Sequence, residues 1–240
     1  MPPSFPHILF DIDGTLTDDR ETPQIDNRFL MGNALFELIA DELHPRGVSR
    51  GEAAALFRNV EARIPYWDYD DFVRELKLPE PGIWERLTHW HRTMLRIYPD
   101  GVNLVHRLFR KGYPLHIVSN NPRTGCLLKL EAAGLGSRTE TPFFKSIFCS
   151  NHQRGQKHSL SFWKRLLSHS GLNPESTLIV GNNLEEDYEV PRHLDFLGSF
   201  IVDRANRYGG QSTGAMLVSS LEEVDPERIP GLSTCAEGVK

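Results

Sequence analysis

Short apolar segments alternate with longer segments of helical periodicity along most of this chain, and that alternation restricts its fold. Five runs have the length and composition of buried strands: His7 to Phe10, Leu115 to Val118, Ser146 to Cys149, Leu178 to Val180 and Phe200 to Val202. Helical stripes separate most of them. Because a helix between two strands usually connects parallel neighbours, the pattern predicts an α/β fold with a mainly parallel sheet and helices on both faces.

Residues 17–98 interrupt the alternation, because they show several helical stripes and no clear period of two. Ser49 and Glu52 have the spacing of a capping box and predict the start of one helix there. Pro99-Asp100-Gly101 predicts a turn where the alternation resumes. We therefore expect an α/β core of residues 1–16 and 99–232, an all-helical cap domain of residues 17–98, and a loosely ordered tail of residues 233–240.

Composition excludes several classes of protein. Of the 240 residues, 39% are hydrophobic and 25% charged, which suits a globular chain and argues against disorder. The net charge of −5 leaves no basic excess for a nucleic acid, and no apolar run approaches the length of a membrane span. The three cysteines form no C-x-x-C pair. We expect a cytoplasmic protein without nucleic-acid or membrane partners; the oligomeric state stays open.

Two carboxylates follow the first predicted strand. Asp11 and Asp13 are two positions apart, so in an extended segment their side chains point the same way. Ligands bind at the carboxyl ends of strands in open α/β sheets. Two close carboxylates repel each other unless a cation or a proton stabilises them. An Asx turn that ends the strand explains the same residues, so this pair alone leaves both readings open.

The longer pattern resembles the haloacid dehalogenase superfamily, most of whose members are phosphatases. The first motif of that family is matched by Asp11-Ile12-Asp13-Gly14-Thr15-Leu16 after its apolar strand. Matches to the other three follow in order: Leu115 to Asn120, then Gly155-Gln156-Lys157-His158 without the usual proline, then Leu178 to Asp187. The resemblance covers nearly the whole chain, and it implies a Rossmann-like core with the helical insert as a cap.

This resemblance assigns a role to each motif. It implies that Asp11 is the nucleophile, which forms an aspartyl-phosphate, and that Asp13 is the general acid and then the general base. It implies that Lys157 balances charge between the phosphate and the nucleophile. Further residues are expected to bind the substrate: Ser119, Asn120, and, beside the leaving group, Asn121 and Arg123.

Mg²⁺ is the cofactor that the resemblance implies. The expected ligands are the Asp11 carboxylate and the main-chain carbonyl of Asp13, with further ligands from the fourth motif. That motif departs from the family, since Asn182 stands where an aspartate is usual. Asp187 and Glu186 would then carry the charge that Asn182 lacks.

The expected function is a Mg²⁺-dependent phosphomonoester hydrolase acting on a small phosphorylated metabolite. Two alternatives stay open: a non-catalytic phospholigand-binding relative in which Asn182 marks a degraded metal site, and a 2-haloacid dehalogenase. The second aspartate, Asp13, argues against the dehalogenase, because dehalogenases of this superfamily typically lack it.

Overall fold

The computed structural model describes residues 5–19, 31–209 and 214–228, so the predicted tail of residues 233–240 lies outside the described residues. Its central element is a six-stranded sheet in the order β5-β4-β1-β6-β7-β8, and every neighbouring pair is parallel. The strands are β1 (His7–Phe10), β4 (Leu115–Ser119), β5 (Ser146–Cys149), β6 (Thr177–Gly181), β7 (Gly198–Val202) and β8 (Met216–Val218). The predicted α/β class is confirmed.

Side chains alternate across this sheet and divide the core into two layers. On β1, Ile8 and Phe10 pack with α5 (Pro99–Arg110) and α6 (Arg123–Ala132), whereas Leu9 faces α8 (Leu160–Ser170). All three β1 residues are completely buried. Both faces of the sheet are therefore covered, which explains why its strands are continuous apolar runs rather than alternating ones.

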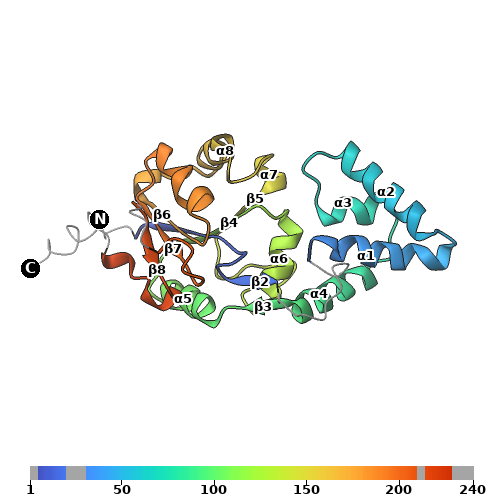
Figure 1. Ribbon diagram of the computed structural model, residues 1–240, viewed down its shortest axis with the longest axis horizontal. Helices are drawn as coiled ribbons and strands as arrows, with labels where there is room; N and C mark the ends of the chain where they lie inside the picture. The colour runs from blue at the N-terminus through green and yellow to red at the C-terminus, as the bar shows by residue number, and fades with distance from the viewer. Residues whose placement is uncertain (1–4, 20–30, 210–213, 229–240) are drawn as a thin grey trace, which may run out of the picture.

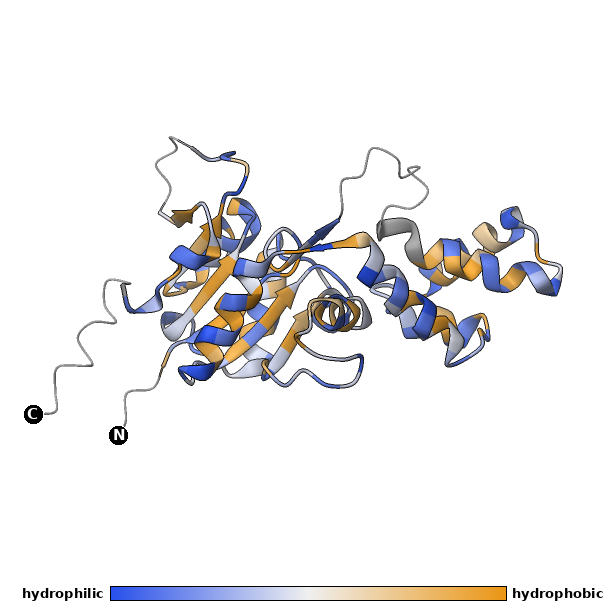
Figure 2. Ribbon diagram, turned by 90° about the horizontal axis from the view of Figure 1, so that it is seen from below, coloured by the Kyte–Doolittle hydropathy of each residue, from blue (hydrophilic) through white to orange (hydrophobic). Residues whose placement is uncertain are grey.

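Four helices at one end of the molecule pack around a hydrophobic cluster of their own (Figures 1 and 2). They are α1 (Met31–Leu43), α2 (Arg50–Arg63), α3 (Tyr69–Glu75) and α4 (Gly82–Met94). The predicted capping box is confirmed at the start of α2, where the Ser49 side chain accepts from the Glu52 backbone N–H and the Glu52 carboxylate accepts from that of Ser49. We call these four helices the cap.

The ends of the stretch predicted to be helical differ from the expectation. They form a two-stranded antiparallel sheet, β2 (Thr17–Asp19) with β3 (Leu95–Ile97). The predicted turn at Pro99-Asp100-Gly101 is wrong, because these residues are the first turn of α5. Proline has no N–H to lose at the first position of a helix and its fixed φ suits that position, so Pro99 begins the helix.

The described part of the chain also contains short helical turns. They are α7 (Ser150–Gln153), the 3₁₀ helices His44–Arg46, Pro174–Ser176, Pro191–Leu194, Leu221–Glu223 and Pro226–Arg228, and a π-helical turn, Glu185–Glu189. None of the helices in the described ranges is both long and apolar enough to cross a bilayer.

Helix α6 belongs to the core but also contacts the cap. Leu127 and Leu130 lie in the core cluster, whereas Leu128 is completely buried in the cluster of the cap. From the cap, Asp68 begins α3, and its Oδ1 also accepts the backbone N–H of Thr124, in the first turn of α6, at 3.0 Å. One carboxylate therefore satisfies backbone donors at the starts of two helices, and it fixes the cap to α6.

Candidate active site

The predicted site residues converge because β4, β1 and β6 are neighbours and end at the same edge of the sheet. Asp11 follows β1, Ser119 ends β4, and Gly181 ends β6. The third motif approaches from the side, and the backbone N–H of Lys157 donates to Asn120 Oδ1 at 2.7 Å. Residues more than 100 positions apart are thereby placed within hydrogen-bonding distance.

Asp11 lies in a buried ion-pair cluster. Lys157 Nζ is 2.5 Å from Asp11 Oδ1 and 2.8 Å from Asp187 Oδ1, and these three side chains are at most 6% exposed. The hydroxyl of Thr15 donates to the other oxygen, Asp11 Oδ2, at 3.1 Å. The Asp11 carboxylate is therefore held by donors on both oxygens, and Lys157 is buried beside it.

Burial and charge act against each other in this cluster. Burial raises the pKa of Asp11 to about 7, although the neighbouring Lys157 ammonium acts to lower it. For Lys157 burial lowers the pKa, but the carboxylates of Asp11 and Asp187 outweigh it and hold the pKa well above its ordinary range. Lys157 is thus a permanent cation, and additional positive charge near Asp11 favours the ionised carboxylate.

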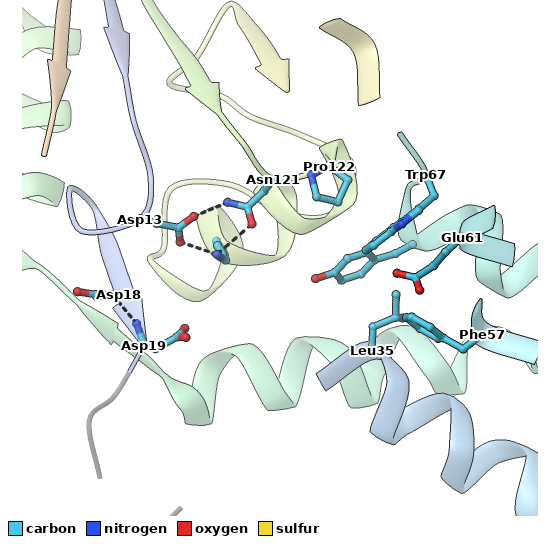
Figure 3. A pocket seen from close by; sticks show the side chains of 11 residues that line it. Asp13, Asp18, Asp19, Leu35, Phe57, Glu61, Trp67, Asn121 and Pro122 are labelled. Carbon is cyan, nitrogen blue, oxygen red and sulfur yellow. Dashed lines mark hydrogen bonds and ion pairs between the residues drawn. The ribbon is translucent and has the colours of Figure 1, made fainter. Parts of the chain in front are cut away.

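Asp13 occupies a different environment, at the edge of a cavity. Its side chain is 45% exposed. Lys129 Nζ lies 2.5 Å from Asp13 Oδ1, and the Asn121 amide donates to Asp13 Oδ2 (Figure 3). Burial would lower the pKa of Lys129, but the Asp13 carboxylate raises it above its ordinary value, so this lysine is also charged.

The four residues predicted to bind substrate divide into two groups. Ser119 and Asn121 belong together, since the Ser119 hydroxyl accepts from the Asn121 side-chain amide at 2.9 Å, which places both beside Asp13. Asn120 is turned away: its amide donates to Glu186 Oε2 at 2.8 Å. Arg123 begins α6, where its backbone N–H donates to Asn151, and it is not among the described residues that line the cavity beside Asp13.

Gly14 permits the close approach of the first and fourth motifs, and Gly181 permits a close contact within the fourth. Gly14 has a φ of +77°, and a Cβ there would lie 1.9 Å from Asn182 Nδ2, so the Asn182 amide packs directly on the first motif. A Cβ on Gly181 would lie 2.2 Å from Asp187 Oδ2. That oxygen accepts the backbone N–H groups of Asn182 and Asn183 at 3.1 and 3.0 Å, so Asp187 shapes the loop that carries Asn182.

The oxygens at this site suit a hard divalent cation. Among the described residues no cluster of three or more His, Cys, Asp or Glu side chains is arranged to bind a metal by itself, so a cation here would also need main-chain or amide oxygens. The motifs bring four carboxyl groups to this edge of the sheet, those of Asp11, Asp13, Glu186 and Asp187, beside the ammonium groups of Lys129 and Lys157. Carboxylate and amide oxygens of this kind would suit Mg²⁺.

A cavity of about 350 Å³ separates Asp13 from the cap. Asp13, Asn121, Pro122 and Lys129 lie on the core side, and Asp18 and Asp19 come from β2. The cap contributes mostly apolar and aromatic side chains to the opposite side: Tyr69 and, as Figure 3 shows, Leu35, Phe57, Glu61 and Trp67. The volume and the lining suit a small organic molecule.

Lys129 is the site residue that the sequence analysis missed. In the sequence it interrupts a run of leucines that reads as the apolar stripe of a helix. The signal was the charge itself: both chain neighbours, Leu128 and Leu130, are buried, and a lysine in such a position needs an anionic partner. The identity of that partner depended on where α6 lies, which the sequence does not show.

Comparisons with known proteins agree with this arrangement. Residues 5–195 match the family model described as haloacid dehalogenase-like hydrolase. A 5'-nucleotidase of Pseudomonas aeruginosa is 22% identical over 189 residues, which are 76% of each chain.

Among solved structures, a HAD phosphatase from Thermococcus onnurineus matches with a TM-score of 0.57 and 22% identity, over 91% of this chain and 95% of that one. The HAD-hydrolase YfnB of Bacillus subtilis, bound to magnesium, matches with a TM-score of 0.53 and 16% identity, over 92% and 97%. These two likenesses concern the fold. With a family model that spans most of its length, this chain belongs to the haloacid dehalogenase-like hydrolases.

Proposed function

We propose that this hydrolase is a Mg²⁺-dependent phosphatase that cleaves a small organic phosphate monoester through an aspartyl-phosphate on Asp11. The observation that carries the proposal is the difference between its two aspartates. Asp11 is buried against a permanent cation, Lys157, whereas Asp13 faces a cavity of small-molecule size. A phosphatase of this kind needs both: a fixed nucleophile, and a second carboxylate that reaches the leaving group.

In the first step an oxygen of Asp11 forms a bond to phosphorus while the bond from phosphorus to the leaving oxygen breaks. Asp13 gives its proton to that oxygen, so the alcohol leaves neutral. Ser119 lies beside Asp13, where its hydroxyl accepts from the Asn121 amide, and we assign it the contact to a phosphoryl oxygen. Lys157 stays next to Asp11 and offsets negative charge as the two anions approach each other.

In the second step Asp13, now ionised, takes a proton from a water molecule. The water oxygen forms a bond to phosphorus, and the bond from phosphorus to Asp11 breaks, which releases inorganic phosphate and restores Asp11. Asn121 holds Asp13 during this exchange through the bond to Oδ2. Splitting the reaction in two lets one fixed site serve both the leaving group and the water.

Three groups would hold Mg²⁺: the carboxylate of Asp11, the main-chain carbonyl of Asp13, and the amide oxygen of Asn182. When bound, the cation would offset the charge of the phosphoryl oxygens. Asp187 and Glu186 contribute negative charge near the cation. The oxygens of Asp187 contact Lys157 and the loop that carries Asn182, and an oxygen of Glu186 accepts from Asn120. The structure of magnesium-bound YfnB supports this choice of metal by analogy of fold.

The test is phosphate release from p-nitrophenyl phosphate, nucleoside monophosphates and sugar phosphates, with Mg²⁺ and with a chelator. We expect turnover that requires Mg²⁺ and is lost in Asp11→Asn; Lys164→Met, on the exposed face of α8, is the control. The 5'-nucleotidase relative makes nucleoside monophosphates the first natural class to test. Release of halide from 2-haloacids, or tight binding of phosphate esters without turnover, would contradict the proposal.

A further inference from the structure

Lys129 is a buried ammonium group that neither step above employs. Its side chain is 7% exposed, and it contacts Asp13 Oδ1 at 2.5 Å and Asn121 Oδ1 at 3.3 Å. An ammonium group with so little exposure is unfavourable unless an anion lies beside it, and Asp13 is that anion. Apolar residues of similar volume often replace buried ion pairs without loss of stability, so fold stability alone does not explain a lysine here.

Lys129 and Asn121 together fix the orientation of the Asp13 carboxylate. One donates to Oδ1 and the other to Oδ2, while the Asn121 amide is itself anchored on the Ser119 hydroxyl. Each carboxylate oxygen has two acceptor sites, so Asp13 can accept both donors and still accept a hydrogen bond from a water in the cavity. Both Asp13 oxygens are therefore held by donors of the protein.

The two proposed steps use Asp13 in different forms. In the first step it carries a proton, and in the second it is a carboxylate that takes a proton from water. The two observed donors orient the carboxylate that the second step needs. Lys129 is also held rigidly, because its neighbours in α6 pack into the core on one side and into the cap on the other.

We propose that Lys129 is a positioning residue for the second step, in which it holds the Asp13 carboxylate toward the water that cleaves the aspartyl-phosphate. This inference rests on the phosphatase chemistry proposed above. Without Lys129 one Asp13 oxygen loses its donor, and the carboxylate turns within the cavity. Hydrolysis of the intermediate then slows, while its formation from a substrate with a good leaving group does not.

The experiment is rapid mixing of the full-length protein and its Lys129→Met variant with p-nitrophenyl phosphate and Mg²⁺. Nitrophenolate leaves without needing a proton, so its release reports the first step alone. In the variant we expect a burst close to one nitrophenol per protein, followed by a steady rate at least about tenfold below that of the unmodified protein. We expect kcat and KM to fall together, with kcat/KM nearly unchanged.

Lys129→Arg should recover part of the steady rate, because it returns a charged donor, and Lys164→Met should behave like the unmodified protein. If Lys129→Met fails to fold, as judged by its melting temperature, Lys129→Gln is measured in the same way.

A fall in kcat/KM without a burst, or an unchanged steady rate, would overturn the role of Lys129. Absence of any nitrophenol release from the unmodified protein would instead overturn the proposed function, so the two failures are distinguishable.

Discussion

The two aspartates of the first motif are two residues apart, yet they lie in opposite environments. The Asp11 side chain is 6% exposed, and its carboxylate accepts hydrogen bonds from Lys157 and Thr15. The Asp13 side chain is 45% exposed, and its partners are Asn121 and Lys129, at the cavity. Each aspartate has its own lysine, one from the loop before α8 and one from α6.

The difference shows how one short motif supplies two chemical roles. A nucleophile benefits from a fixed position and from little competition by water, which burial provides. An acid and base must exchange protons with a leaving group and with water, so it needs an exposed oxygen. The Asp11 surroundings come entirely from the core, whereas those of Asp13 include a helix that also packs against the cap.

Replacing the nucleophile should produce the largest effect. We expect Asp11→Asn to reduce phosphate release by about 10⁴-fold or more, because no other group can form the covalent intermediate. Its thermal stability should not fall, since burial disfavours the charge of Asp11 and Lys157 keeps Asp187 as a partner. Activity within tenfold of the unmodified protein would contradict the covalent mechanism.

A pair of matched variants should sharpen the contrast in stability. Asp187→Asn removes the charge of a completely buried group that pairs with Lys157 and also accepts the backbone N–H groups of Asn182 and Asn183, so the free energy of unfolding should fall by about 3 kcal/mol. Asp13→Asn should cost about 1 kcal/mol, because Lys129 lines the cavity and water can reach it. Urea denaturation measures both, and equal losses would show that the two environments do not differ as described.

Acid should lower the free energy of unfolding through His91. This histidine is completely buried in α4, and burial lowers its pKa to about 4. Between pH 6.5 and 4 the unfolded chain binds a proton that the folded one does not, so stability falls as the pH falls through this window. From pH 7 to 5 the loss from His91 should be about 2 kcal/mol. Urea denaturation at both pH values should show that His91→Leu loses less stability than the unmodified protein, by that amount. If both proteins lose the same stability between pH 7 and 5, the loss comes from other groups.

The smallest predicted effect concerns the neutral amide in the fourth motif. Asn182→Asp adds a negative charge where Asn182 packs on Gly14, so we expect Mg²⁺ to bind about tenfold more tightly. Calorimetric titration of Mg²⁺ into both proteins measures the change without reference to activity. Equal affinities would remove Asn182 from the proposed ligands.

The elements that the sequence predicted correctly are those governed by local patterns. The strands before Asp11 and Ser119 are apolar because both faces of the sheet are covered, and the capping box at Ser49 depends only on residues close in the chain. β2 and β3 were missed because each has three residues, too few to show an alternation.

Contacts between distant residues account for what the sequence left open in the site. Asn120 and Asn121 are chemically identical neighbours, and only the packing of the second motif decides that Asn121 contacts Asp13 while Asn120 contacts Glu186. Lys129 is similar, because its partner is 116 positions away in the chain. The residue types in the motifs predicted the chemistry of the site. Which of two residues of the same type contacts Asp13 depends on the fold.

The contact of Asp68 with the start of α6 limits how this enzyme can be recombined with its relatives. A cap exchanged at the ends of residues 17–98 would be separated from two partners on α6. Asp68 would lose the Thr124 N–H, and the hydrophobic cluster of the cap would lose Leu128. The unit that can be transplanted is therefore larger than the inserted sequence. A chimaera that also carries the cap-facing residues of α6 should keep Lys129 in register with Asp13, whereas one made at the sequence boundaries should not.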